Sequence, residues 1–131
     1  EYISNSYFYS DTYDSARVYN RMLLQEAQKH GTPTQIGDGY SREGMNYSVD
    51  FLITLSVDAY LKAAEFYLEA GDSIALARGY GDMALTLEKS DEDKEAERYY
   101  QEAIDILENV QAPIDYVVTL INFRFIKWEL E

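Results

Sequence analysis

The chain has no cysteine and only two prolines, seven glycines and one histidine among its 131 residues. Without cysteine it can form neither a disulfide nor a thiol nucleophile nor a sulfur-ligated metal site. The shortage of proline and glycine disfavours a turn-rich β fold and favours helices. The lack of cysteine suits the periplasm and does not exclude the cytoplasm, so the compartment stays unknown.

Long apolar runs and basic residues are also scarce. No stretch approaches the roughly 20 apolar residues that cross a bilayer, and the start lacks the basic-then-apolar pattern of a signal peptide. We therefore expect no membrane insertion. Eleven basic against twenty-four acidic residues give a net charge of −13, which repels phosphate groups. We expect no nucleic acid as a partner, and a basic or neutral protein or peptide is easier to accommodate.

Residues for catalysis are few. The single histidine, His30, is expected to face the negative end of a helix dipole. The acidic run from Asp91 to Glu95 lacks the glycine and the ligand spacing of a calcium loop. Acidic residues stabilise the N-terminus of a helix, and this role explains the run better than calcium binding does. Gly37-Asp38-Gly39 lacks the lysine and the strand of a phosphate-binding loop. We predict no catalytic residue, no metal and no cofactor, and hence no enzyme.

The sequence does contain a period of about forty residues. One series pairs positions 40 residues apart: Tyr40 with Tyr80, Gly44 with Ala84, and Tyr47 with Leu87. A second series has spacings of 41 and 39: Ala16, Val57 and Ala96, with Ala64 recurring as Ala103. Small residues that return in step with aromatic ones indicate that one helix pair is stacked several times. The predicted fold is therefore an α-solenoid with a long groove.

Local signals divide the chain into helices, with no strand. After a helix tail at residues 1–9, six helices are predicted: from a cap at Asp11 to His30, 36–52, 55–70, from a cap at Asp72 to about Glu88, from a cap at Ser90 or Asp91, and from Pro113 to the end. Gly31 suits a left-handed residue after a helix, Pro33 prevents continuation, and Gly71 ends the third helix. We assign one domain, 1–131, with a partial repeat at 1–31, repeats at 33–71 and 72–110, and the first helix of another at 112–131. Because the chain begins with Glu1, we expect a fragment of a longer protein.

Two motifs, Tyr80-x3-Ala84-x2-Leu87 and Ala96-x3-Tyr100-x2-Ala103, together resemble the tetratricopeptide repeat. In that family, small residues let the two helices of a repeat touch and adjacent repeats nest. The matching positions are Gly44 and Ala84 in first helices, and Ala16 and Ala96 in second helices. Val57 and Asn122 depart from this pattern. The period exceeds the usual value of about 34 and resembles that of variants in bacterial sensor proteins, Rap-type peptide receptors and kinesin light chains. HEAT-type repeats share this length, but the small-residue pairs argue against them.

The resemblance implies an all-α, right-handed solenoid of antiparallel helix pairs whose first helices line a peptide-binding groove. It implies a sensing or interaction region of a larger bacterial signalling or regulatory protein. The alternative is an assembly scaffold or adaptor that binds protein tails and has no sensory role. The family's inward-facing positions fall on one set of residues, which we call the wall: Asp38, Ser41, Arg42, Met45, Ser48, Arg78, Asp82, Leu85, Glu88, Thr119, Leu120 and Phe123.

Two arginines stand out on the wall of an otherwise acidic chain. In one hypothesis Arg42 and Arg78 hold a carboxylate of a peptide ligand, while apolar members of the wall grip its apolar side chains. In the other, the two arginines pair with Asp38 and Asp82 on a solvated face. The sequence leaves both open.

Two apolar segments raise the question of what covers them. The run Phe51-Leu52-Ile53-Thr54-Leu55 lies at a helix-helix turn, where it either forms an exposed patch for a partner or tucks under a neighbouring helix. In the last helix, apolar residues cover too much of the circumference for a free edge: Val117, Val118, Leu120, Ile121, Phe123, Phe125, Ile126, Trp128 and Leu130. We expect a following helix, or a second copy in a homodimer, to cover this helix.

Overall fold

The computed structural model describes residues 5–110, 114 and 117–123, and the side chains at 15, 17–110, 114 and 117–123. This described part contains helices and turns but no strand, which confirms the all-α prediction. The helices are α1 (Asn5–His30), α2 (Pro33–Val49), α3 (Ile53–Ala70), α4 (Ser73–Glu88) and α5 (Asp93–Glu108), and residues 114 and 117–123 are helical as well. None of the helices described is long and apolar enough to cross a bilayer.

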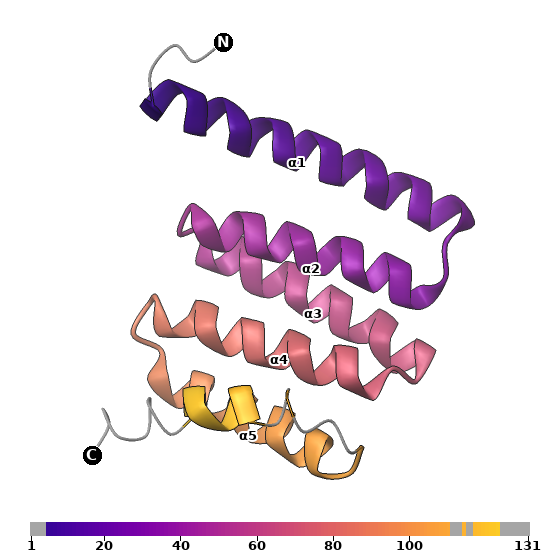
Figure 1. The fold of residues 1–131 in the computed structure, drawn as a ribbon, viewed down its shortest axis with the longest axis vertical. Coiled ribbons are helices and arrows are strands. Elements are labelled where there is room, and N and C mark those ends of the chain that lie inside the picture. Colours follow the sequence, from indigo (N-terminus) through magenta and orange to yellow (C-terminus); the bar gives the residue numbers. More distant parts are fainter. Residues whose placement is uncertain (1–4, 111–113, 115–116, 124–131) are drawn as a thin grey trace.

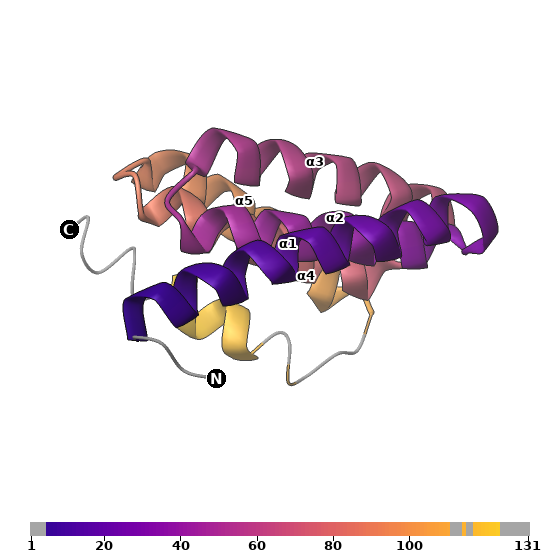
Figure 2. The same cartoon turned by 90° about the horizontal axis from the view of Figure 1, so that it is seen from above.

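The helices form a row in which each one packs on the next. Consecutive helices run in opposite directions (Figure 1). α2 also contacts α4, and in the view from above α3 lies along one side of α2 (Figure 2). Among α1 to α5, α1 contacts α2 alone. Most tertiary contacts therefore join helices that are neighbours in the sequence.

The pairs α2–α3 and α4–α5 have the same backbone pattern. Their helices start 40 residues apart: Pro33 and Ser73 for the first helices, Ile53 and Asp93 for the second. The turn inside each pair contains one left-handed residue that is not glycine, Phe51 with φ 59° and Asp91 with φ 60°. The next amide donates to a carbonyl five residues back, at 2.9 Å in the first pair and 3.1 Å in the second. The sequence period of 40 is thus matched by a backbone period of 40.

Local capping sets several helix ends. Thr32 and Gln35 form a capping box, in which each side chain accepts a hydrogen bond from the other residue's amide, and Pro33 occupies the first turn. Asp72 caps α4 by accepting from the amide three residues on, at 3.1 Å. Gly71 ends α3 in the left-handed conformation, with φ 69°. The predictions for Gly71 and Asp72 are confirmed.

Several other predicted boundaries are wrong. α1 runs through Asp11 without a break, because a single capping residue does not interrupt a helix that continues on both sides. α2 begins at Pro33 rather than 36, since the capping box starts it directly after α1. For the same reason Gly31 is not left-handed; among the described glycines, only Gly71 has a positive φ.

The start of α5 also differs from the prediction. Its N-cap is Glu92, which makes no side-chain capping bond, and neither Ser90 nor Asp91 takes that role. Asp91 is instead the left-handed residue of the turn, and the Ser90 hydroxyl donates to the Leu87 carbonyl. Residues 1–4, Pro113, and the last-helix positions Phe125, Ile126, Trp128 and Leu130 lie outside the described residues, as does the side chain of Ala16.

Within the pairs, helices approach at small residues, at the predicted Gly44, Ala84 and Ala96 and, in place of Val57, at Ser56. The Ser56 hydroxyl donates to the Gly44 carbonyl at 2.7 Å, and Ser56 is fully buried. The counterparts 40 residues on, Ala84 and Ala96, are fully buried too. Val57, predicted for this role, is only partly buried. The small-residue series is therefore regular, and the apparent spacings of 41 and 39 came from choosing the neighbour of Ser56.

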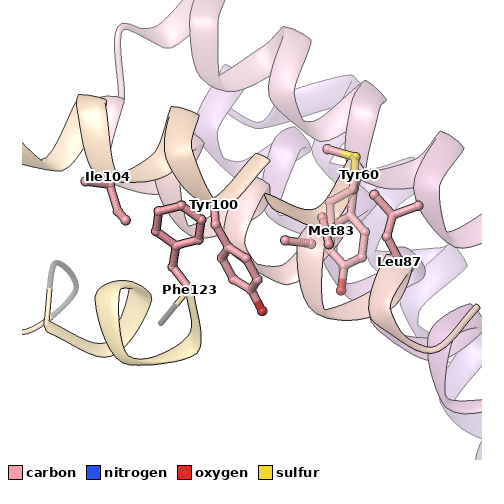
Figure 3. Close-up of a cluster of buried hydrophobic side chains, with 8 residues drawn as sticks. Tyr60, Met83, Leu87, Tyr100, Ile104 and Phe123 are labelled. Carbon is pink, nitrogen blue, oxygen red and sulfur yellow. The ribbon is translucent and has the colours of Figure 1, made fainter. Parts of the chain in front are cut away.

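The same correction applies to the next small position, because fully buried Ala63, and not Ala64, lies 40 residues before fully buried Ala103. The main core is built around such second-helix positions. Its larger side chains converge from three helices and the C-terminal segment (Figure 3): Tyr60, Met83, Leu87, Tyr100, Ile104 and Phe123. This core joins the two helix pairs and positions α2 and α4, which carry most of the predicted wall.

Candidate functional site

The wall residues of α2 and α4 form two matching sets. Corresponding residues are 40 positions apart: Asp38 with Arg78, Arg42 with Asp82, and Met45 with Leu85. The order of the charges is thus reversed from one helix to the other. Met45 and Leu85 are 52% and 42% exposed, and both arginines are exposed. Spacings of three and four keep each set on one helix face, and α2 contacts α4.

Arg42 is oriented by a buried side chain of α1. Its Nε donates to Oδ1 of Asn20 at 3.1 Å, and Asn20 Nδ2 donates to the Gly39 carbonyl at 3.1 Å. Asn20 is only 4% exposed. The Arg42 guanidinium is therefore held by the side-chain amide of Asn20, which is itself hydrogen-bonded to the α2 backbone. Sequence analysis missed Asn20; its position, 40 residues before Tyr60, was the available signal.

Asp38 is held from the opposite side, by α3. The Tyr67 hydroxyl donates to Asp38 Oδ1 at 2.7 Å and lies 3.1 Å from the Ser41 hydroxyl. Burial, above all, raises the pKa of Tyr67, so the phenol keeps the proton that it donates. Asp38 and Arg42 are thus each bonded to a different neighbouring helix.

The wall carboxylate at the Arg42 position of α4 is Asp82, which is partly buried. Burial raises the pKa of Asp82, and the positive charge of Arg78 counteracts part of this shift. Glu88, a further wall residue, accepts a hydrogen bond of 2.5 Å from the Tyr100 hydroxyl. Burial and this bond to Glu88 raise the pKa of Tyr100. The α4 part of the wall therefore carries two carboxylates and one arginine, and the Tyr100 hydroxyl of α5 is bonded to one of these carboxylates.

Three predicted wall residues lie in the interior. Ser48 is 6% exposed, and its hydroxyl accepts from Thr86 at 3.1 Å and from Lys89 Nζ at 2.9 Å. Phe123 is 8% exposed, and its ring centroid lies 6.2 Å from that of Tyr100 (Figure 3). Thr119 is buried too, and Leu120 is half-buried against the same core. Packing between repeats takes up these side chains, so we leave Ser48, Thr119 and Phe123 out of the binding surface.

An open cleft of about 440 Å³ lies between the second half of α1 and the first half of α2. Arg42 and Asp38 line it from α2, and Leu23 and Ala27 from α1. His30 and Glu26 line its end, with His30 Nε2 3.7 Å from Glu26 Oε2. The cleft thus combines opposite charges with an apolar floor.

Exposed apolar side chains gather in three further places. At the α2–α3 turn, Phe51 is 67% exposed and lies beneath the Lys89 ammonium, 5.4 Å from its ring centroid. This turn is therefore not tucked under a helix. The outer face of α1 and the C-terminal helical residues also present apolar side chains: Val18, Tyr19 and Met22, and Ile114, Val117, Val118 and Ile121.

Nothing in the described residues points to an inorganic cofactor. In this part of the chain, no group of three or more histidine, aspartate or glutamate side chains is arranged to hold a metal ion. Compared with known protein families and with curated proteins, the chain matches none.

Proposed function

We propose that this chain is a peptide- or protein-binding helical-repeat module of the tetratricopeptide type, serving as the sensing or interaction region of a larger bacterial signalling or regulatory protein. The main support is the 40-residue recurrence of helix starts, turns and close contacts in two helix pairs whose first helices, α2 and α4, contact each other. Repeats stacked in this way offer parallel rows of side chains to an extended ligand.

The charges on this surface favour a ligand with both acidic and basic groups. Arg42 is pre-oriented by Asn20, and such fixed guanidinium groups bind carboxylates well. The carboxylates of Asp82 and Glu88 on α4 offer acceptors for a lysine or arginine side chain of the ligand. Exposed Met45 and Leu85 lie on the same faces and supply apolar contact.

Selection of binders from a displayed random-peptide library tests this proposal. A selected peptide should lose at least about tenfold in affinity for the variant R42A/R78A, since charge-assisted hydrogen bonds contribute about 1.5–3 kcal/mol each. The matched control is R98A, which removes a similarly exposed arginine from α5, where it pairs with Glu95. If R42A/R78A bound the peptide with unchanged affinity, the two arginines would not be part of the binding site.

The same peptides separate the main proposal from an adaptor that binds protein tails. Amidation of the C-terminus removes the carboxylate that a tail-binding groove reads. A large loss of affinity on amidation favours the adaptor, and retained affinity favours an internal or side-chain carboxylate as the contact for Arg42.

We also propose that a second copy covers the outer face of the C-terminal helical residues. Ile114 is 78% exposed and Ile121 is 60% exposed, and Val117 and Val118 are exposed by half or more. Sedimentation equilibrium should show a dimer that I121E dissociates, because a buried charge without a partner is strongly unfavourable. The matched control is L68E on the exposed face of α3. A monomer at all concentrations would contradict this contact.

A further inference from the structure

The cleft between α1 and α2 is lined by two opposite charges, each of which is held in place by a hydrogen bond to another helix. Arg42 and Asp38 lie one turn apart on α2, close enough to face the same small ligand. Arg42 is bonded to Asn20 of α1, and Asp38 to Tyr67 of α3. Each charge is held at its own helix interface, so both are oriented before any ligand arrives.

The floor of the cleft supplies apolar contact next to these charges. Leu23 and Ala27 are one turn apart on α1 and line the cleft opposite Arg42. The volume of about 440 Å³ lies within the range of sites for small organic ligands, roughly 300–1,000 Å³. A ligand that fits has one positive group, one negative group and a modest apolar side chain.

The corresponding space at the next helix interface is filled. Forty residues after Leu23 and Ala27 stand Ala63 and Tyr67, which are 0% and 3% exposed. The counterpart of Asn20 is Tyr60, also buried, at 3% exposed. The repeat therefore opens a cleft at its first interface and closes it at the second.

We propose that this cleft binds a free α-amino acid with an apolar side chain, as its zwitterion. The carboxylate accepts hydrogen bonds from Arg42, the ammonium donates to Asp38, and the side chain lies on Leu23 and Ala27. An α-amino acid carries both charged groups on one carbon, which matches two opposite charges one helical turn apart. This inference goes beyond the proposed function and shares Arg42 with it.

NMR titration of the protein with L-leucine tests the assignment. Leucine should shift the Arg42 Nε–H signal and the Ala27 amide in a saturable way. The probes 4-methylpentanoate, which lacks the ammonium, and 3-methylbutylamine, which lacks the carboxylate, should each bind at least about tenfold more weakly. Equal binding of leucine and the two analogues, or shifts that do not saturate, would overturn the proposal.

Variants locate the site. R42Q and D38N should each weaken leucine binding at least about tenfold, since each removes one charged contact, while R98Q on α5 should leave it unchanged. N20L keeps the size of the side chain, removes both hydrogen bonds of Asn20, and should weaken binding while the Arg42 Nε–H loses its protection from exchange. If N20L does not fold, R42Q and D38N still decide, because wild-type affinity in both would refute the assignment.

The outcomes also separate this inference from the peptide-binding proposal. If library peptides bind and leucine does not, the cleft assignment fails and the peptide surface stands. If leucine binds in the cleft and no peptide is selected, the peptide surface fails and the amino-acid site stands.

Discussion

The pairs α2–α3 and α4–α5 pack their two helices together at equivalent positions but with different residues. In the first pair Gly37 lies against the ring of Tyr67, where an added Cβ would come within 2.7 Å of a ring carbon. In the second pair the counterparts are Ala77 and Leu107, which pack in one buried cluster. A glycine against a tyrosine and an alanine against a leucine fill similar space. The repeat thus preserves the combined volume of a contact and not the size of either side chain.

The close approach of the two helices differs in polarity as well. In the first pair a hydroxyl mediates it, since Ser56 donates to the Gly44 carbonyl. In the second pair the corresponding residues, Ala84 and Ala96, are both fully buried in one hydrophobic cluster and have no hydroxyl. A small side chain is what the geometry requires, and its chemistry can vary. Four measurements test how far the pairs are equivalent.

The largest effect is expected at the aromatic position that the pairs share. Tyr100 is fully buried and Tyr60 is 3% exposed, so Y100A and Y60A should each lower the free energy of unfolding by about 3–5 kcal/mol. Urea denaturation measures both. Y100F is the control, because it keeps the ring and loses only the bond to Glu88, which should cost about 1–3 kcal/mol. A small effect of Y60A beside a large one of Y100A would show that the pairs are not equivalent.

An intermediate effect is expected where glycine meets tyrosine. G37A should destabilise by about 1–3 kcal/mol, because its Cβ would overlap the Tyr67 ring. Adding Y67L copies the second pair and should make the double variant less destabilised than the sum of the single changes. The reverse change A77G should cost about 1 kcal/mol through helix propensity, and a further amount because it removes a methyl group that is buried against Leu107. Strict additivity in the double-mutant cycle would contradict the compensation.

A smaller effect is expected at the hydroxyl. S56A converts the polar approach into the apolar one of the second pair and should cost about 1 kcal/mol, the value of one buried hydrogen bond. The reverse change, A96S, places a hydroxyl in the apolar core and should also destabilise, as measured by thermal unfolding. If A96S were stabilising, the added hydroxyl would have found a hydrogen-bond acceptor at the contact between α4 and α5.

The smallest effect concerns the reversed charges. Because the pKa of Asp82 is raised in the fold, its protonated form is the one that the fold favours. The stabilising contribution of protonation is complete below the ordinary value of 3.8 and is lost as the pH rises through the folded pKa. D82N should therefore raise stability at pH 7 and flatten the pH dependence above 3.8, whereas D58N on the exposed face of α3 should do neither. If D82N lowered the stability at pH 7, the interactions of the Asp82 carboxylate would stabilise the fold by more than the burial of its charge destabilises it.

The sequence predicted features that depend on local chemistry. The helix end at Gly71, the cap at Asp72 and the period of 40 each follow from residues within one turn or from simple recurrence. The interpretation failed where a neighbouring helix decides. Val57 and Ser56 are both plausible at a contact, and only packing against Gly44 selects Ser56.

The candidate site shows the same limit. Positions of Arg42 and Asp38 on α2 could be inferred from helical spacing and the family resemblance. Their partners could not, because Asn20 and Tyr67 come from helices on opposite sides of α2. Ser48 was misplaced for a similar reason, since its burial depends on Lys89 and Thr86 from α4 and the turn that follows it.

Among the five helices, α1 borders a single neighbour, and this has a kinetic consequence. Detaching a helix that has one neighbour disrupts one interface, whereas freeing a helix that has two disrupts both, so amide protons of α1 should exchange with solvent ahead of those in α3 and α4. Half of the cleft proposed to bind an amino acid lies on α1. A ligand bound between α1 and α2 would stabilise their interface. Ligand binding should therefore slow amide hydrogen exchange along the whole of α1.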